Sequence, residues 1–139
     1  DFDWFNYGGL TRSLHLVHVP ATHLGAVRAS LDADGRVALS ARVEGEAREG
    51  ATVRFAMPAL GIEVDARVAD GEARATAQPR AFTAWSPQSP KLYELRAELR
   101  LGATIASPAA SASASTAAST TASPLDAITD RVGLRRIET

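Results

Sequence analysis

Three histidines near the start of the chain are the side chains whose type and spacing could hold a metal ion. His15, His18 and His23 fall close together, and imidazole is the commonest metal ligand in proteins. His15 and His18 are three positions apart, so a β-strand would point them to opposite faces. His23 follows Pro20, beyond such a strand. The spacing therefore favours surface or rim histidines over a shared zinc site, and we predict no metal and no cofactor.

The acidic residues do not form a recognisable acid/base pair. General acid–base catalysis needs a carboxyl group whose pKa is tuned by its surroundings. The eight glutamates fall mostly on the expected outward faces of strands or in turns, and none falls in an apolar pocket that the sequence identifies. The sequence also shows no nucleophile elbow, metal-ligand spacing or phosphate-binding loop. We therefore expect no catalysis by this chain alone.

The bulk composition fits one globular domain. The chain has 139 residues, no cysteine and a formal net charge of −1. A nearly neutral balance gives no reason to expect a nucleic-acid or anionic-membrane partner. The absence of cysteine excludes disulfides and thiolate metal sites. No apolar run approaches the roughly 18 residues that a membrane span needs.

Alternation of apolar and polar residues is the dominant pattern, and it is typical of β-strands with one buried face. Turns are indicated at residues 32–35, 48–50 and 58–61 and at Asp70-Gly71. Strands at spacings of about ten residues predict an all-β fold, an antiparallel β-sandwich of seven to eight strands. The clearest strands are expected over residues 36–44, 53–57, 62–68 and 93–101, and weaker ones over 13–19, 24–32, 72–78 and 127–132.

The expected core includes one tryptophan and three residues of the strand over 93–101. Trp85 is expected to plug one end of the core, and Tyr93, Leu95 and Leu99 to line it. Residues 103–125 are almost wholly alanine, serine and threonine, with too few large apolar side chains to offset their ordering entropy by burial. We predict that they form an expanded loop between two strands.

Three sequence motifs resemble those of glycoside hydrolase family 2. Residues 3–12, Asp-Trp-Phe-Asn-Tyr-Gly-Gly-Leu-Thr-Arg, are similar to the D-x-x-N-Y-x-G-[IL]-x-R signature between the first two domains of that family. Residues 85–95 resemble its W-x-P-x-x-P-x-L-Y-x-L motif, and residues 130–138 its D-x-x-G-[FL]-R-x-I-E motif. The motifs occur in the family's order and extend over nearly the whole chain.

The resemblance implies a place within a larger β-galactosidase- or β-glucuronidase-type enzyme, whose members carry a sugar-binding jelly roll, an immunoglobulin-like sandwich and a (β/α)8 barrel. Residues 1–12 would be the junction from the jelly roll, and residues 13–138 the immunoglobulin-like β-sandwich. The partners would be the jelly-roll and barrel domains of the same polypeptide. Hydrolysis of O-glycosidic bonds, with retention, would use two glutamates of the barrel. The chain would therefore be non-catalytic.

The resemblance also implies roles for residues of the first motif. In the family, the aspartate at the position of Asp3 hydrogen-bonds a hydroxyl of the sugar, so Asp3 is expected to reach the substrate in the intact enzyme. The aromatic residues could stack on a sugar ring, but a dense cluster at a domain edge favours contacts with neighbouring domains. The expected domain-interface residues are Trp4, Phe5, Asn6, Tyr7 and Arg12.

Two other functions fit parts of the sequence. A free-standing immunoglobulin-like or fibronectin-like module for carbohydrate binding or adhesion would account for the strands, but it leaves the three ordered motifs unexplained. A small enzyme in its own right lacks any recognisable catalytic motif. The sequence therefore favours the non-catalytic domain of a glycosidase, which contacts carbohydrate only within the intact protein.

Overall fold

A computed structural model of the chain describes residues 9, 12–46, 49–101 and 123–135. These residues form seven antiparallel strands and one short 3-10 helix, so the predicted all-β fold is confirmed. The strands follow the spatial order β1-β2-β5-β4-β3-β6-β7. Their bounds are β1 (His23–Leu31), β2 (Val37–Glu44), β3 (Thr52–Met57), β4 (Ile62–Ala69), β5 (Glu72–Ala77), β6 (Tyr93–Arg100) and β7 (Asp126–Val132), with the 3-10 helix η2 (Pro58–Leu60) after β3.

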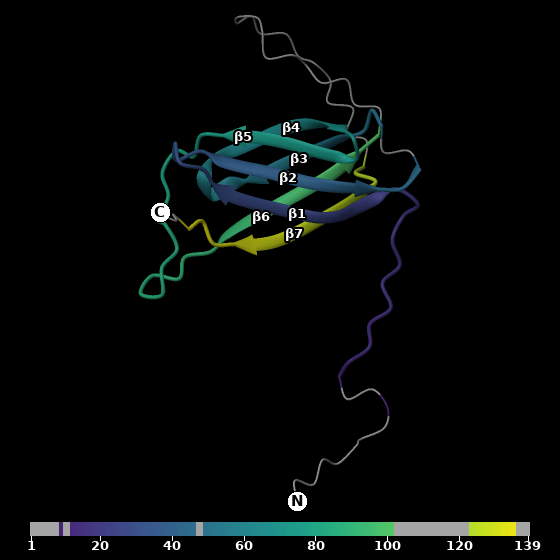
Figure 1. Ribbon diagram of the computed structural model, residues 1–139, viewed down its shortest axis with the longest axis horizontal. Helices are drawn as coiled ribbons and strands as arrows, with labels where there is room; N and C mark the ends of the chain where they lie inside the picture. The colour runs from purple at the N-terminus through teal and green to yellow at the C-terminus, as the bar shows by residue number, and fades with distance from the viewer. Residues whose placement is uncertain (1–8, 10–11, 47–48, 102–122, 136–139) are drawn as a thin grey trace, which may run out of the picture.

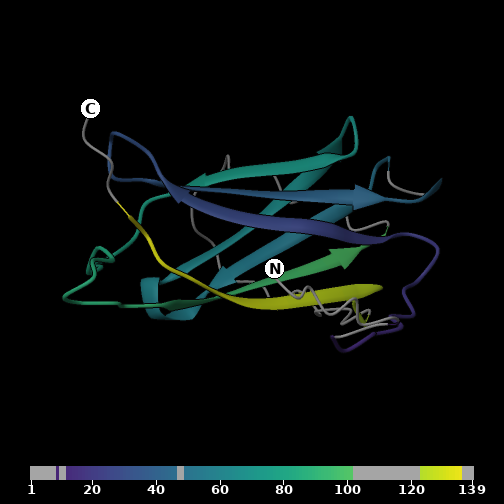
Figure 2. The ribbon, with the colours of Figure 1, turned by 60° about the horizontal axis from the view of Figure 1, so that its bottom comes forward.

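The sheet folds over on itself into two layers, as Figures 1 and 2 show. One layer holds β1, β2 and β5, and the other holds β4, β3, β6 and β7. β4 joins the layers, because it pairs with β3 along its length but with β5 only through Val68 and Ala69. The first and last strands, β1 and β7, meet where the Leu24 N–H donates to Asp126 Oδ2 over 2.8 Å. The sheet is therefore nearly closed.

The inward-facing residues of both layers form one hydrophobic core. Phe55 of β3 is fully buried there, with Val64 and Ala97 opposite it on the two neighbouring strands. Regular alternation produces this core, since every second side chain of a strand faces the same way. The largest fully buried side chains are Phe55, Leu39, Met57, Leu60, Leu95, Leu99, Leu134, Val37, Val43 and Val53.

Three of the four side chains assigned to the core from the sequence are buried there. Tyr93, Leu95 and Leu99 lie inside, and the Tyr93 hydroxyl accepts a hydrogen bond from the Thr83 N–H over 2.7 Å. Trp85 is only half-buried and does not belong to the core, so that assignment was wrong. The reason is that Trp85 precedes β6 by several residues and packs on the backbone after β7 instead.

The hairpin between β4 and β5 turns where the sequence predicts it. Asp70 has φ 53° and Gly71 has φ 75°, and the flanking residues Ala69 and Glu72 pair directly. Two consecutive left-handed residues are the requirement of a type I′ turn, which aspartate and glycine satisfy best. This turn brings the chain from one layer of the sandwich to the other.

The expected strand over residues 13–19 is wrong. These residues pair with no strand of the described part of the chain, and the sandwich begins only at His23. Residues 12–19, which we call the arm, run away from the sandwich (Figure 1). Alternation in a sequence indicates that a segment has apolar surface to bury, but it does not indicate in which sheet. Most of the predicted loop, residues 102–122, lies outside the described residues.

Candidate functional site

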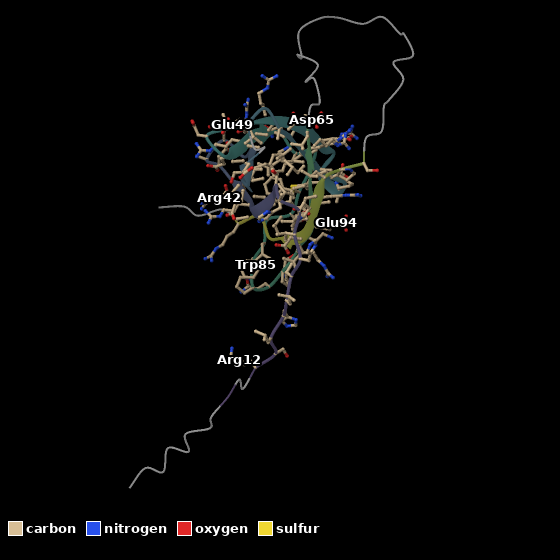
Figure 3. All side chains as sticks on the ribbon, turned by 90° about the vertical axis from the view of Figure 1, so that its right-hand side faces the viewer. Arg12, Arg42, Glu49, Asp65, Trp85 and Glu94 are labelled. Carbon is tan, nitrogen blue, oxygen red and sulfur yellow. The ribbon has the colours of Figure 1, made fainter. Side chains whose placement is uncertain are left out.

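Most of the site residues expected from the first motif cannot be placed. Asp3, Trp4, Phe5, Asn6 and Tyr7 lie outside the described residues. Arg12 is described, and Figure 3 shows it on the arm, far from the body of the sandwich. Its side chain is exposed, so an interface contact of Arg12 would have to be made with something other than the described sandwich.

The base of the arm is held firmly against the end of the sandwich where β1 and β7 begin, which we call the arm end. His23 Nδ1 lies 3.1 Å from the Pro20 carbonyl oxygen. A carbonyl oxygen can only accept, so the imidazole donates from this nitrogen. The other ring nitrogen, Nε2, lies 3.8 Å from Glu44 Oε2. These contacts join the segment before β1 to the last residue of β2.

Gly45 completes this arrangement at the arm end. Its φ is 112°, and a Cβ atom built on it would lie 2.2 Å from the Ala21 carbonyl oxygen and 2.7 Å from Thr22 Cα. Only a residue without a side chain allows this close approach of two backbone segments. The chain therefore enters the sandwich from the arm at a position set by packing as well as by hydrogen bonds.

The histidines do not come together. His15 and His18 are exposed on the arm, whereas His23 is half-buried at its base. Within residues 9, 12–46, 49–101 and 123–135, no group of three histidine, aspartate or glutamate side chains is close enough to hold a metal ion.

The opposite end of the sandwich, where β7 ends, has its own contact between distant segments. We call it the exit end. The Trp85 N–H donates to the Leu134 carbonyl over 2.7 Å, and the Trp85 ring lies directly against Gly133. A Cβ atom on Gly133 would come within 2.8 Å of Trp85 Cδ1. Leu134 is fully buried. The segment after β7 is thus fastened to the β5–β6 loop before it leaves the sandwich.

The exposed large hydrophobic residues lie on the arm or at the ends, not on the faces of the sandwich. Leu101 follows β6 and Leu125 precedes β7, which places both at the arm end. Leu92 precedes β6 at the exit end, beside the pair formed by Tyr93 and Val132. Within the described residues, the full set is Leu14, Leu16, Val17, Val19, Leu92, Leu101 and Leu125.

The outer face of the β4-β3-β6 layer is covered by ion pairs. Arg54 of β3 contacts Glu63 and lies 4.0 Å from Asp65, both of β4. Glu98 of β6 pairs with arginines of its own strand, at distances of 3.0 and 2.6 Å. Charged side chains that are already paired with one another are less available to bind a ligand. The two arginines are Arg96 and Arg100.

The outer face of the β1-β2-β5 layer carries an open depression around a second charged cluster. Arg28, Ser40 and Arg74 lie in one row across the three strands, and Glu72 is beside them. A hydrogen bond of 2.7 Å from Arg74 lowers the pKa of Glu72, and Ser40 and Arg28 add to this effect. A lowered pKa keeps the carboxylate charged, whereas a general acid needs its proton near neutral pH. This cluster is therefore not an acid catalyst.

We expect Arg74→Gln to raise the pKa of Glu72 toward its ordinary value, because the charge-assisted hydrogen bond is the largest cause of the lowered pKa. The carboxyl chemical shift of Glu72 followed by NMR during a pH titration measures this change. Arg42→Gln is the control, since Arg42 faces Glu72 across the strands but contacts Glu44 at 3.5 Å.

The direction of the shift in the pKa of Glu72 determines how the stability contributed by the Glu72–Arg74 pair depends on pH. The folded pKa of Glu72 lies below the unfolded one, so the contribution of the pair is complete above the unfolded pKa. It is lost as the pH falls through the folded pKa. An identical Glu72 titration in wild type and Arg74→Gln would show that the pair does not form in solution.

The contacts between distant segments described above thus lie at the two ends of the sandwich rather than around a cleft. Sequence reasoning missed Gly45 and Gly133 as contact positions, because nothing in the sequence says which backbone approaches a glycine.

No protein-family model matches the chain, and no curated protein matches it either. The resemblance to glycoside hydrolase family 2 therefore stays a prediction from the three motifs. The described residues contain no helix long and apolar enough to cross a bilayer.

Proposed function

We propose that this chain is the non-catalytic β-sandwich domain of a glycoside hydrolase family 2 enzyme. In the intact protein it holds a jelly-roll sugar-binding domain and a catalytic barrel at fixed positions, and it contributes Asp3 to the sugar site. The observation that carries this proposal is the placement of exposed hydrophobic residues on the arm and at the two ends. Exposed apolar surface of this kind is typical of contacts with other protein surfaces.

The course of the chain supports the role of a spacer. β1 and β7 run in the same direction, because an even number of antiparallel steps separates them in the strand order. The chain therefore joins the sandwich at the arm end and leaves it at the exit end (Figure 1). The seven residues of β7 span about 20 Å at roughly 3.3 Å per residue. A close-packed core makes this separation rigid.

The faces of the sandwich argue against a free-standing carbohydrate-binding module. Sugar rings stack on exposed aromatic side chains, which present an apolar face. Among the described residues, Phe55 and Tyr93 are buried, and Phe82 and Trp85 are half-buried. No described aromatic residue is exposed, and ion pairs cover much of the outer surface.

The proposal is tested by comparing two proteins in assays with chromogenic glycosides and on a glycan array. One protein is the 139-residue chain, and the other is the natural polypeptide that contains it. We expect no turnover and no glycan retention by the chain alone, and hydrolysis with retention of configuration by the natural polypeptide. Glycan binding by the isolated chain would favour the free-standing module. A natural polypeptide without glycosidase activity would overturn the proposal.

The same assay tests the role proposed for Asp3. In the active polypeptide, Asp3→Ala is expected to weaken sugar binding by about 1.5–3 kcal/mol, the range for a hydrogen bond to a charged group. This corresponds to roughly a 10- to 150-fold rise in KM where KM reports binding. Asp1→Ala is the matched control, two residues away, and is expected to leave KM unchanged.

A further inference from the structure

Both ring nitrogens of His23 have a partner at the base of the arm. Nδ1 lies 3.1 Å from the Pro20 carbonyl oxygen, and Nε2 lies 3.8 Å from Glu44 Oε2. The His23 side chain is 23% exposed, so water has limited access to the ring. His23 is the first residue of β1 and pairs across the sheet with Glu44, the last residue of β2. The imidazole therefore joins the segment before β1 to the end of the neighbouring strand.

The two partners make opposite demands on a neutral imidazole. A neutral ring has one N–H donor, and its other nitrogen is an acceptor. The Pro20 carbonyl can only accept, so the single proton of the neutral ring is on Nδ1. Nε2 then presents a lone pair to the Glu44 carboxylate, which is also an acceptor. In the neutral state, the contact between His23 and Glu44 is therefore not a hydrogen bond.

Protonation of the ring removes this conflict. The added proton is on Nε2, which becomes a donor and places a positive charge beside the Glu44 carboxylate. Nδ1 keeps its proton and its hydrogen bond to Pro20. Both contacts of His23 are then favourable at once. Histidine is the type of side chain that ordinarily gains its charge between pH 8 and pH 5, so a change of pH in this range selects between the two states.

A glycine holds the Glu44 carboxylate where it can respond to this proton. The register between β1 and β2 shifts around Gly25, which marks a β-bulge. A Cβ atom built on Gly25 would lie 2.7 Å from Glu44 Oε1, so the carboxylate lies directly against this glycine. The absence of a side chain at residue 25 thus gives the carboxylate its place beside His23.

The charged groups that the described contacts place near His23 come from the strands on both sides of β1. Glu44 and Arg42 belong to β2, and their side chains approach to 3.5 Å. Asp126 of β7 accepts the Leu24 N–H over 2.8 Å. Arg42 is 72% exposed, so water and salt screen its charge. Two carboxylates and one guanidinium leave one negative charge uncompensated, and protonated His23 balances it.

We infer that Pro20, His23 and Glu44 form a pH-sensitive joint, which holds the base of the arm more tightly when the imidazole is protonated. In acid, both ring nitrogens donate, and the segment before β1 is fastened to Pro20 and Glu44 together. Above the range in which histidine loses its proton, only the hydrogen bond to Pro20 remains, and the joint loosens. All three residues belong to the described chain, so the joint does not depend on the proposed function.

The protonation state of the His23 ring provides the first test. Long-range ¹H–¹⁵N correlation spectra of the 139-residue chain distinguish the two neutral tautomers and the charged ring. At about pH 8, His23 is expected to be the Nδ1–H tautomer, and at about pH 5.5 both nitrogens are expected to be protonated. His15 and His18 are the internal controls, because they are exposed on the arm. An Nε2–H tautomer of His23 at about pH 8 would contradict the hydrogen bond to Pro20 and overturn the inference.

The exchange rate of the Leu24 amide provides the second test. Leu24 follows His23, and its N–H reaches Asp126 only while the start of β1 is in place. After correction for the intrinsic pH dependence of amide exchange, this amide is expected to exchange roughly 2- to 5-fold more slowly at about pH 5.5 than at about pH 8. This is the range that a partly exposed ion pair allows. Equal protection at both values would overturn the inference.

Two variants assign the pH response to the His23–Glu44 contact. Glu44→Gln removes the negative charge from a side chain that is 48% exposed, so the fold is expected to persist while Leu24 loses its extra protection in acid. His18→Gln is the matched control on the arm and is expected to leave the response of Leu24 unchanged. A full pH response in Glu44→Gln, or its loss in His18→Gln, would assign the effect to another group and overturn the inference.

Discussion

Replacing Leu99 with alanine is expected to lower the free energy of unfolding by about 2–5 kcal/mol, the range for a leucine removed from a packed core. Leu99 is fully buried on β6, with Val53 of β3 paired beside it. Loss of its isopropyl group leaves a cavity that the closely packed layers can fill only in part. A loss of this size is a large fraction of the stability of a small domain.

Leu101→Ala is the matched control for this prediction. Leu101 lies two positions further along the same alternation, but β6 ends at Arg100 and Leu101 is 48% exposed. Its truncation is expected to cost less than about 1 kcal/mol. Urea denaturation followed by far-ultraviolet circular dichroism measures both variants. Equal losses for the two leucines would contradict the end of β6 and the position of the core.

Leu99 and Leu101 show that the alternation of apolar and polar residues predicts burial within a strand but not at its end. The pattern treats the two leucines alike, since both fall on the apolar side of one strand. The structure separates them because β7 begins at Asp126 and the partner strand β3 begins at Thr52, so neither of these described strands extends far enough to cover Leu101. Burial near a strand end depends on the lengths of its neighbours, which a local pattern does not contain.

The same reasoning explains why the strands and the tight turn could be predicted while other features could not. The Asp70-Gly71 turn is local, because two left-handed residues suffice to define it. The position of Trp85 is not local, since its ring packs against Gly133, 48 positions further along the chain. The prediction of a sandwich strand over residues 13–19 also failed because strand pairing depends on segments far away in the sequence. Their apolar residues suggested a strand, but no strand of the described chain lies beside them to pair with.

The candidate site was harder to predict than the fold for a related reason. The sequence motifs predicted a site made of charged and aromatic residues near the start of the chain. Most of these residues lie outside the described residues. The contacts that hold the two ends of the sandwich involve Gly45, Gly133 and backbone carbonyl groups instead. Such positions have no chemical signature, because their importance comes from the close approach of another segment.

Gly45→Ala is expected to be among the most destabilising single changes in the described part of the chain. Strain from a non-glycine residue at φ 112° costs about 1–3 kcal/mol by itself. The new Cβ atom would also lie 2.2 Å from the Ala21 carbonyl oxygen, and relief of this overlap requires a backbone shift at the base of the arm. We therefore expect a total loss of more than about 3 kcal/mol.

Gly35→Ala separates the two contributions to the Gly45 effect. Gly35 also has a positive φ, 75°, but nothing lies within 4 Å of a Cβ atom built there. This variant is therefore expected to show only the conformational cost, about 1–2 kcal/mol. Urea denaturation of both variants gives the difference, which reports the overlap with Ala21. If Gly45→Ala were no more destabilising than Gly35→Ala, the segment before β1 would not be packed against the end of β2. The arm end would then lack the fixed joint that the proposed spacer function requires.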